Sequence, residues 1–138
     1  MFAALSSIHW LAVLAAFAAY YFLGAAWFAA LFAKPYRVSL GKAHEAPAPM
    51  SPIFFVGPAL CTLVVTVASA GLMQLLHIST YGQAVEFALY VGLGYLVANT
   101  VNIAINPNIP RPLLYSLISG SYHLVGILLA SLLLVALS

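Results

Sequence analysis

The stretch that decides the fold is the last hydrophobic run of the chain, LLYSLISGSYHLVGILLASLLLVAL, residues 113–137. It contains no Asp, Glu, Lys or Arg, and a single histidine, His123, stands near its middle. A helix needs about 20 apolar residues to cross the ~30 Å hydrocarbon core of a bilayer. The run therefore predicts a membrane-spanning helix, and it raises the question of what His123 does inside it.

The composition of the whole chain agrees with a membrane protein. Hydrophobic residues make up 65% and charged residues only 4%, whereas soluble domains carry roughly 25% charged residues. Because the connections after the second and third runs are short, we expect an all-α, integral membrane, four-helix up-and-down antiparallel bundle. The Pro-rich first connection predicts an irregular loop. The expected helices of this single transmembrane domain, residues 1–138, are about 8–33, 53–76, 83–105 and 113–137.

The basic residues predict the orientation. All four lie in the first and third connections: Lys34, Arg37, Lys42 and Arg111. Connections that carry Lys and Arg stay on the cytoplasmic side. We therefore expect the loops at about 34–52 and 106–112 to be cytoplasmic and both termini to lie on the outer side of the cell inner (plasma) membrane.

Polar side chains at one depth suggest a belt across the bundle. His123 follows Arg111 by 12 residues, which at 1.5 Å per residue places it ~18 Å into the membrane, near the midplane. Tyr20, Thr66 and Tyr95 fall at matching depth on the other helices. We predict that these four side chains, His123 included, face one another in the bundle interior.

The third helix extends this pattern toward the cytoplasm. Tyr95, Asn99 and Asn102 follow one another at spacings of four and three residues, which places them on one helical face. We expect Asn99 and Asn102 to open toward the cytoplasmic side. They would then either line a hydrated half-channel or hydrogen-bond to a neighbouring helix.

The belt itself has two interpretations. His123 is either a neutral imidazole that holds helices together through Tyr95 or a serine, or a proton relay or ligand group. For Thr66 and its neighbours the simpler interpretation is that each hydroxyl bonds the backbone carbonyl four residues earlier.

A weaker hypothesis concerns a metal site on the outer side. His9, His77 and Glu86 fall near that membrane surface, and two imidazoles with a carboxylate suit zinc, copper or non-haem iron. The alternative is that Glu86 reaches the interface and His9, beside Trp10, belongs to an aromatic belt. The spacing matches no recognised metal motif, and we expect no cofactor.

Catalysis and nucleic-acid binding have little support. The chain has no Asp, no GxSxG or HExxH motif, and one cysteine, Cys61, so that hydrolytic and thiol-pair chemistry lack their residues. A net charge of +2 gives no reason to expect a nucleic-acid partner. We expect a protein that is not an enzyme.

Two stretches resemble a known family. They are FLGAAWFAALFAKPYRVSLG, with Gly24, Trp27, Lys34 and Gly41, and YSLISGSYHLVGILLASLLL, with Tyr122 and His123; Asn102 or Asn106 is similar to the polar end of the family's third helix. The family comprises small bacterial and fungal membrane proteins catalogued as a domain of unknown function. The resemblance implies four transmembrane helices and no established activity. The chain departs from the family pattern at Phe28, where Tyr is frequent, and at Tyr36, where Trp is frequent.

Two classes of function remain. The first is a structural, accessory or self-associating membrane subunit, whose partners are the lipid bilayer, further copies of itself or a larger membrane complex. The second is a protein that binds or passes a small solute or a proton through the belt of Tyr20, Thr66, Tyr95 and His123. We favour the first class, because no charged residue lies deep in any helix and coupled transporters usually keep one there.

Overall fold

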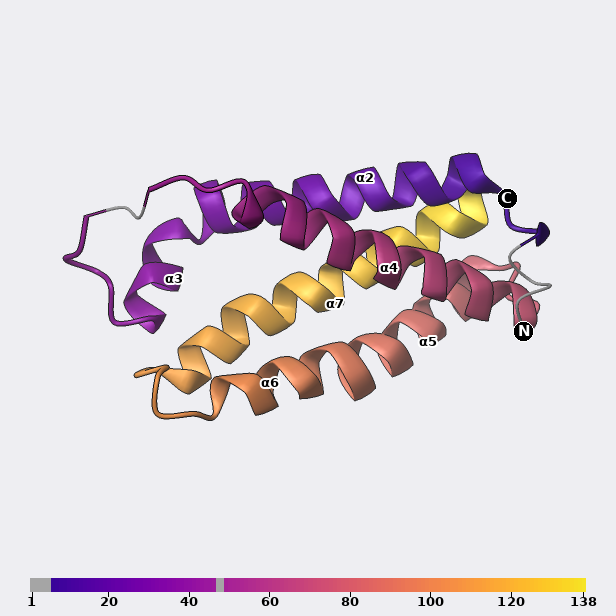
Figure 1. Ribbon diagram of the computed structural model, residues 1–138. Helices are drawn as coiled ribbons and strands as arrows, with labels where there is room; N and C mark the ends of the chain where they lie inside the picture. Colours follow the sequence, from indigo (N-terminus) through magenta and orange to yellow (C-terminus); the bar gives the residue numbers. More distant parts are fainter. Residues whose placement is uncertain (1–5, 47–48) are drawn as a thin grey trace.

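The structure is a computed structural model that describes residues 6–46 and 49–138. Within these residues all regular secondary structure is helical, which confirms the expected all-α class (Figure 1). Four helical segments are long and apolar enough to cross a membrane. They are α2 (Trp10–Ala26) with the π-helix η1 (Trp27–Leu31), α4 (Ile53–Leu75), α5 (Tyr81–Val91) with η2 (Gly92–Val97) and α6 (Ala98–Ala104), and α7 (Pro112–Ala136).

The predicted ends of these segments differ from the observed ends by at most two residues. One short helix was missed: α3 (Ala33–Ser39) occupies part of the first connection, so the expectation of an irregular loop is wrong there. Pro35 lies in the first turn of α3, where a backbone N–H has no helical partner in any case, and a proline there removes no hydrogen bond. The chain bends between η1 and α3 at Phe32.

Local signals explain where two of the long segments begin. Thr80 caps α5: its hydroxyl accepts from the backbone N–H of Gln83, whose side chain reaches back to the backbone N–H of Thr80. Pro112 opens α7 at the first helical position, where its fixed φ favours a helix start.

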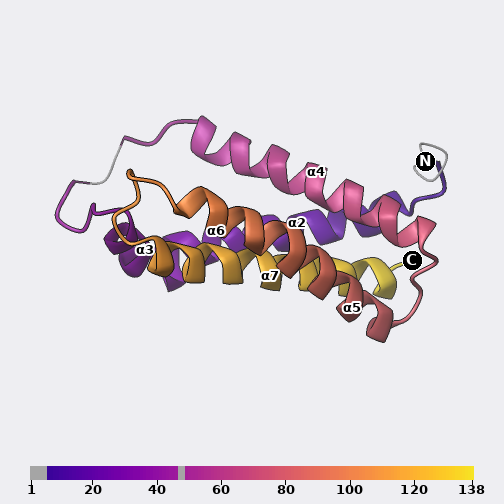
Figure 2. The ribbon, with the colours of Figure 1, turned by 90° about the horizontal axis from the view of Figure 1, so that it is seen from below.

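The four segments run in alternating directions, so that α2 begins and α7 ends at the same end of the molecule (Figure 1). Helix α7 lies at the centre and packs against α2 on one side and against α5, η2 and α6 on the other. Helix α4 packs mainly on α2 and stands apart from the other helices over much of its length (Figure 2). In the most apolar 18-residue stretch of α7, half of the residues are buried inside the protein, compared with 22% to 28% in the other three segments. Helix α7 is therefore the core helix.

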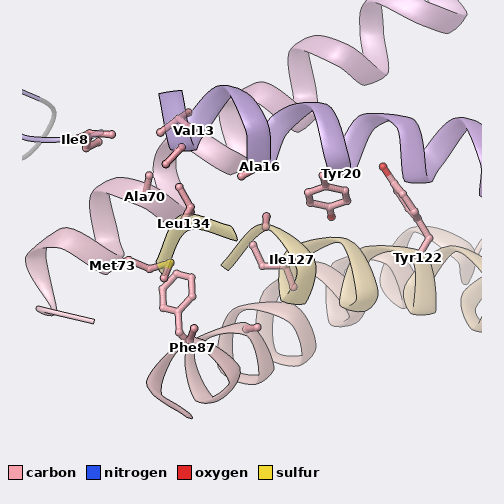
Figure 3. Close-up of a cluster of buried hydrophobic side chains, with 14 residues drawn as sticks. Ile8, Val13, Ala16, Tyr20, Ala70, Met73, Phe87, Tyr122, Ile127 and Leu134 are labelled. Atoms are coloured by element: carbon pink, nitrogen blue, oxygen red, sulfur yellow. The ribbon is translucent and has the colours of Figure 1, made fainter. Parts of the chain in front are cut away.

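Small side chains let the helices approach α7 closely. Several of the core alanines have no exposed surface: Ala12, Ala16, Ala84, Ala88 and Ala130. Larger side chains such as Ile127, Leu134 and Phe87 fill the space between them (Figure 3). Close approach through small residues is the usual way in which helices pack inside a membrane.

Candidate functional site

The centre of the candidate site is a contact between α2 and α7. The Tyr20 hydroxyl lies 3.0 Å from Nδ1 of His123 and 3.3 Å from the backbone oxygen of the same residue. Tyr20 is 2% exposed, and His123 is half-buried. The sequence-based prediction that these two side chains face one another is therefore confirmed.

Two glycines make this contact sterically feasible. A Cβ atom on Gly126 of α7 would overlap the ring of Tyr20, and a Cβ atom on Gly24 of α2 would lie 2.8 Å from the Tyr122 hydroxyl oxygen. Tyr20 thus points from α2 toward α7, and Tyr122 points from α7 toward α2 (Figure 3). Each ring lies beside a glycine of the facing helix. Their ring centroids are 5.4 Å apart.

Tyr122 is also the hub of an aromatic cluster. Its ring centroid lies 5.1 Å from Phe28, 6.4 Å from Trp27 and 4.8 Å from the His123 ring. Trp27 in turn donates its indole N–H to the backbone oxygen of Ile118, at 3.0 Å. These contacts fix η1 against α7 at the level of the cluster.

A cavity of about 620 Å³ opens beside the cluster. It lies between α2, α7 and α6 on one side and the first turns of α4 on the other, where Ile53 to Val56 are all exposed. Most of its wall is apolar, with Phe54, Phe55 and Pro58 of α4 facing Phe28 of η1. Cys61 also lines it.

Several polar side chains also line the cavity. They belong to Tyr21, Tyr36, Thr62, Thr100, Tyr115, Ser119, Tyr122 and His123. The Thr100 hydroxyl is satisfied by the backbone oxygen of Leu96, at 2.7 Å. The Ser119 hydroxyl is buried and has no hydrogen-bond partner among the described residues. No Asp, Glu, Lys or Arg lines the cavity.

Thr66 reaches the interior without joining the contact between Tyr20 and His123. It is fully buried, and its hydroxyl donates to the backbone oxygen of Thr62, at 2.8 Å. This confirms the simpler interpretation, in which the hydroxyl bonds its own helix.

The remaining member of the predicted belt, Tyr95, lies on the outside, so the prediction that it faces the interior is wrong. Tyr95 is 73% exposed, and Asn99 and Asn102 are exposed as well. The face of this segment that meets α7 is made instead of smaller residues. Gly92 fits so closely that a Cβ there would lie 2.7 Å from a methyl group of Leu124.

The predicted metal site lacks the required geometry. His9, His77 and Glu86 are all exposed. In the described part of the chain no three His, Cys, Asp or Glu side chains come close enough to hold a metal ion. His9 instead borders a small cavity of about 60 Å³ at the end of the molecule where α2 begins. The hypothesis of a metal bound by these three residues is therefore wrong.

The sequence-based prediction missed the central place of Tyr122 and the buried, unpaired hydroxyl of Ser119 beside the cavity. A signal for Tyr122 exists. The pattern Tyr-x-x-x-Gly occurs in α2 as Tyr20 and Gly24 and again in α7 as Tyr122 and Gly126. In antiparallel helices, these repeats bring each tyrosine beside the glycine of the other helix.

The fold and the site define a small α-helical protein with four segments able to span a membrane and a largely apolar cavity among them. The chain belongs to the family described as Protein of unknown function (DUF1761), which matches residues 11–135. This confirms the family resemblance seen in the sequence. No curated protein and no solved structure matches the chain.

Proposed function

We propose that this protein is a multi-pass protein of the cell inner membrane that binds a neutral, largely apolar small molecule in the cavity beside His123. The observation that carries the proposal is the cavity itself. Its volume of about 620 Å³ falls within the roughly 300–1,000 Å³ of small-molecule sites, which combine apolar walls with a few convergent polar groups.

The polar groups of His123 and Ser119 indicate where the head group of the ligand binds. Tyr20 occupies Nδ1 of His123, whereas Nε2 has no hydrogen-bond partner among the described residues. The unpaired hydroxyl of Ser119 lines the same cavity. A ligand hydroxyl or carbonyl can serve both groups, because an imidazole and a hydroxyl each donate or accept.

The walls indicate that the ligand is uncharged. A charge in the membrane interior requires a partner of opposite sign or water, and no charged side chain lines the cavity. The apolar part of the ligand then lies along Phe28, Phe54 and Phe55. Binding of this kind requires no chemistry, and the protein functions without catalysis.

Permeation of a proton or a polar solute has less support. Such a path needs polar groups at successive depths. Tyr95, Asn99 and Asn102, which would extend the path from His123 toward the cytoplasm, do not line the cavity. The first function class, a structural, accessory or self-associating subunit, concerns the outer surface of the protein and is compatible with ligand binding.

The proposed orientation follows the basic residues. The loops at about 34–52 and 106–112 carry every Lys and Arg of the chain, so they face the cytoplasm and both termini face outward. The cavity then opens in the cytoplasmic half of the membrane, because Tyr36 and Met50 of the first connection line it.

The single cysteine provides a test. Cys61 is exposed and lines the cavity, so we use its alkylation by N-ethylmaleimide in lipid nanodiscs as the probe of occupancy. We expect 1-decanol to slow alkylation about tenfold more than decane does at the same mole fraction. The decanol hydroxyl adds one hydrogen bond, and a tenfold difference in affinity corresponds to about that free energy. A matched control is Cys61→Ser with Val64→Cys, which moves the thiol to a lipid-facing position on the same helix, 67% exposed.

Substitution of two buried serines distinguishes an effect on ligand binding from an effect on stability. Ser119 and Ser131 both have buried hydroxyls without a partner in the described part of the chain, but only Ser119 lines the cavity. Ser119→Ala should weaken the protection by decanol, and Ser131→Ala should leave it unchanged. Equal protection by decanol and decane, or equal slowing at the Val64→Cys position, would overturn the proposal.

A further inference from the structure

The outward face of the third membrane segment is unusually polar. Tyr95, Asn99 and Asn102 are exposed there. The segment ends at Ala104, so at 1.5 Å per residue Asn99 lies about 7 Å and Tyr95 about 13 Å inside it. We call these three side chains, together with the exposed Gly94 and Ala98 of the same segment, the amide face.

The polar groups of the amide face lack partners. In the described residues, nothing forms a hydrogen bond with the side chain of Asn99 or Asn102. Asn106, by contrast, lies just beyond the segment and is satisfied: its amide donates to the backbone oxygen of Ile103, at 2.5 Å, and accepts from the backbone N–H of Asn108. Lipid chains offer no hydrogen bonds, so an amide facing lipid is unfavourable unless another protein surface covers it.

Gly94 gives a second, independent indication. A Cβ atom built on Gly94 would meet nothing within 4 Å. The nearby Gly92 is required for packing against α7, as Gly120 is for contact with Val97, where a Cβ would lie at 3.3 Å. Gly94 therefore has no role in packing within the chain, and a glycine on an outer surface allows the backbone of another helix to approach closely.

We propose that the amide face binds a second copy of the same chain, forming a dimer with a two-fold axis along the membrane normal. All copies enter the membrane in one orientation, so this axis brings residues of equal depth together. Asn99 then meets Asn99 of the second copy, and Asn102 lies beside its counterpart.

The charge pattern of the amide face favours a copy of itself over a different protein. A carboxamide carries partial negative charge on its oxygen and partial positive charge on its NH₂ group. Two amides related by a two-fold axis can therefore donate to and accept from one another. The Tyr95 hydroxyl is likewise both donor and acceptor, and no Asp, Glu, Lys or Arg occurs between Phe87 and Ala104 to require an oppositely charged partner.

Cysteine cross-linking of the full chain in liposomes tests this proposal. In the Cys61→Ser background, Ala98→Cys places a thiol within the amide face. Leu117→Cys places one at similar depth on α7, where Leu117 is 69% exposed. We expect oxidation with copper phenanthroline to give a disulfide-linked dimer for Ala98→Cys and mainly monomer for Leu117→Cys.

Changes to the amides show whether they hold the dimer. The double variant Asn99→Leu and Asn102→Leu should raise the dissociation constant of the dimer, measured by energy transfer on dilution with lipid, about tenfold. Asn99→Gln with Asn102→Gln keeps the amides and should retain most of the affinity. None of these residues lines the cavity, so the result is independent of the proposed ligand.

Three outcomes would overturn the proposal. The first is equal cross-linking of the Ala98→Cys and Leu117→Cys variants. The second is a dissociation constant that the double leucine variant does not change. The third is an Ala98→Cys variant that stays monomeric after purification but forms an adduct of a different mass in native membranes. That result would assign the amide face to another protein.

Discussion

The Tyr20 hydroxyl lies 3.0 Å from Nδ1 of His123, across 103 residues of sequence. This contact explains how a histidine is accommodated midway along a helix that is long and apolar enough to cross a membrane. One side of the ring is hydrogen-bonded to α2 in the interior, and the residue also lines the cavity. This supports the structural interpretation of His123, but its partner is Tyr20 and not the expected Tyr95 or a serine.

The first prediction concerns this contact. Tyr20→Phe removes the hydroxyl and leaves Nδ1 without its partner, so we expect the free energy of unfolding to fall by about 1 kcal/mol, the usual value for one hydrogen bond. Steric trapping in bicelles measures the change in stability. Nitrogen-detected NMR in bilayers should show a changed hydrogen-bonding state of the His123 ring.

Tyr95→Phe is the matched control for this variant, because it removes a tyrosine hydroxyl from a position that is 73% exposed. It should leave the His123 spectrum unchanged. A His123 signal that responds to Tyr95→Phe and not to Tyr20→Phe would contradict the structure.

The second prediction tests the close fit between the helices. A Cβ on Gly126 would overlap the Tyr20 ring, so Gly126→Ala forces Tyr20 or α2 to move. Overpacking of this kind costs about 1–3 kcal/mol, and we expect a loss of stability in this range by the same steric-trap measurement.

Gly57→Ala provides the control, since a Cβ at Gly57 would meet only a methyl group of Ile53, at an ordinary 3.9 Å. Its effect should be small or stabilising, because alanine favours a helix over glycine by about 1 kcal/mol. Equal destabilisation by both alanines would show that α2 and α7 do not meet as described.

The sequence predicts the membrane segments well because their signal is local. Hydrophobic runs such as residues 113–137 determine a helix by length and composition alone. The direction that a helix face points depends on its neighbours, and the prediction for Tyr95 failed for this reason. The rule that polar faces turn inward conflicts here with close packing of small residues, because Gly92 packs tightly against Leu124 on the face that meets α7.

The cavity could not be predicted from the sequence for a similar reason. It exists because the first turns of α4 stand apart from α6 and α7, and no local pattern encodes that separation. The contact between Tyr20 and His123 was predictable, since equal depth and facing small residues both favoured it. The contact of Tyr122 with Gly24 could have been predicted only from the Tyr-x-x-x-Gly pattern that α2 and α7 share.

The third prediction is a pH dependence outside the membrane segments. Burial, reinforced by the neighbouring Tyr115, raises the pKa of Tyr36 in α3 to about 12, above the value of about 10 for an unfolded chain. The folded protein therefore holds this proton more tightly than the unfolded chain does. Its contribution to stability is complete below about pH 10 and is lost as the pH rises toward 12.

Comparison with Tyr36→Phe isolates this effect. Relative to the variant, the wild-type protein should lose free energy of unfolding only above about pH 10, and the difference in absorbance at the tyrosinate band should appear late in the titration. Tyr81→Phe, which changes an exposed ring at the start of α5, controls for the loss of a tyrosine. The Tyr36 and Tyr115 ring centroids are 5.8 Å apart. If the difference in free energy of unfolding between wild type and Tyr36→Phe stays constant across this pH range, the Tyr36 ring is open to water and the prediction is wrong.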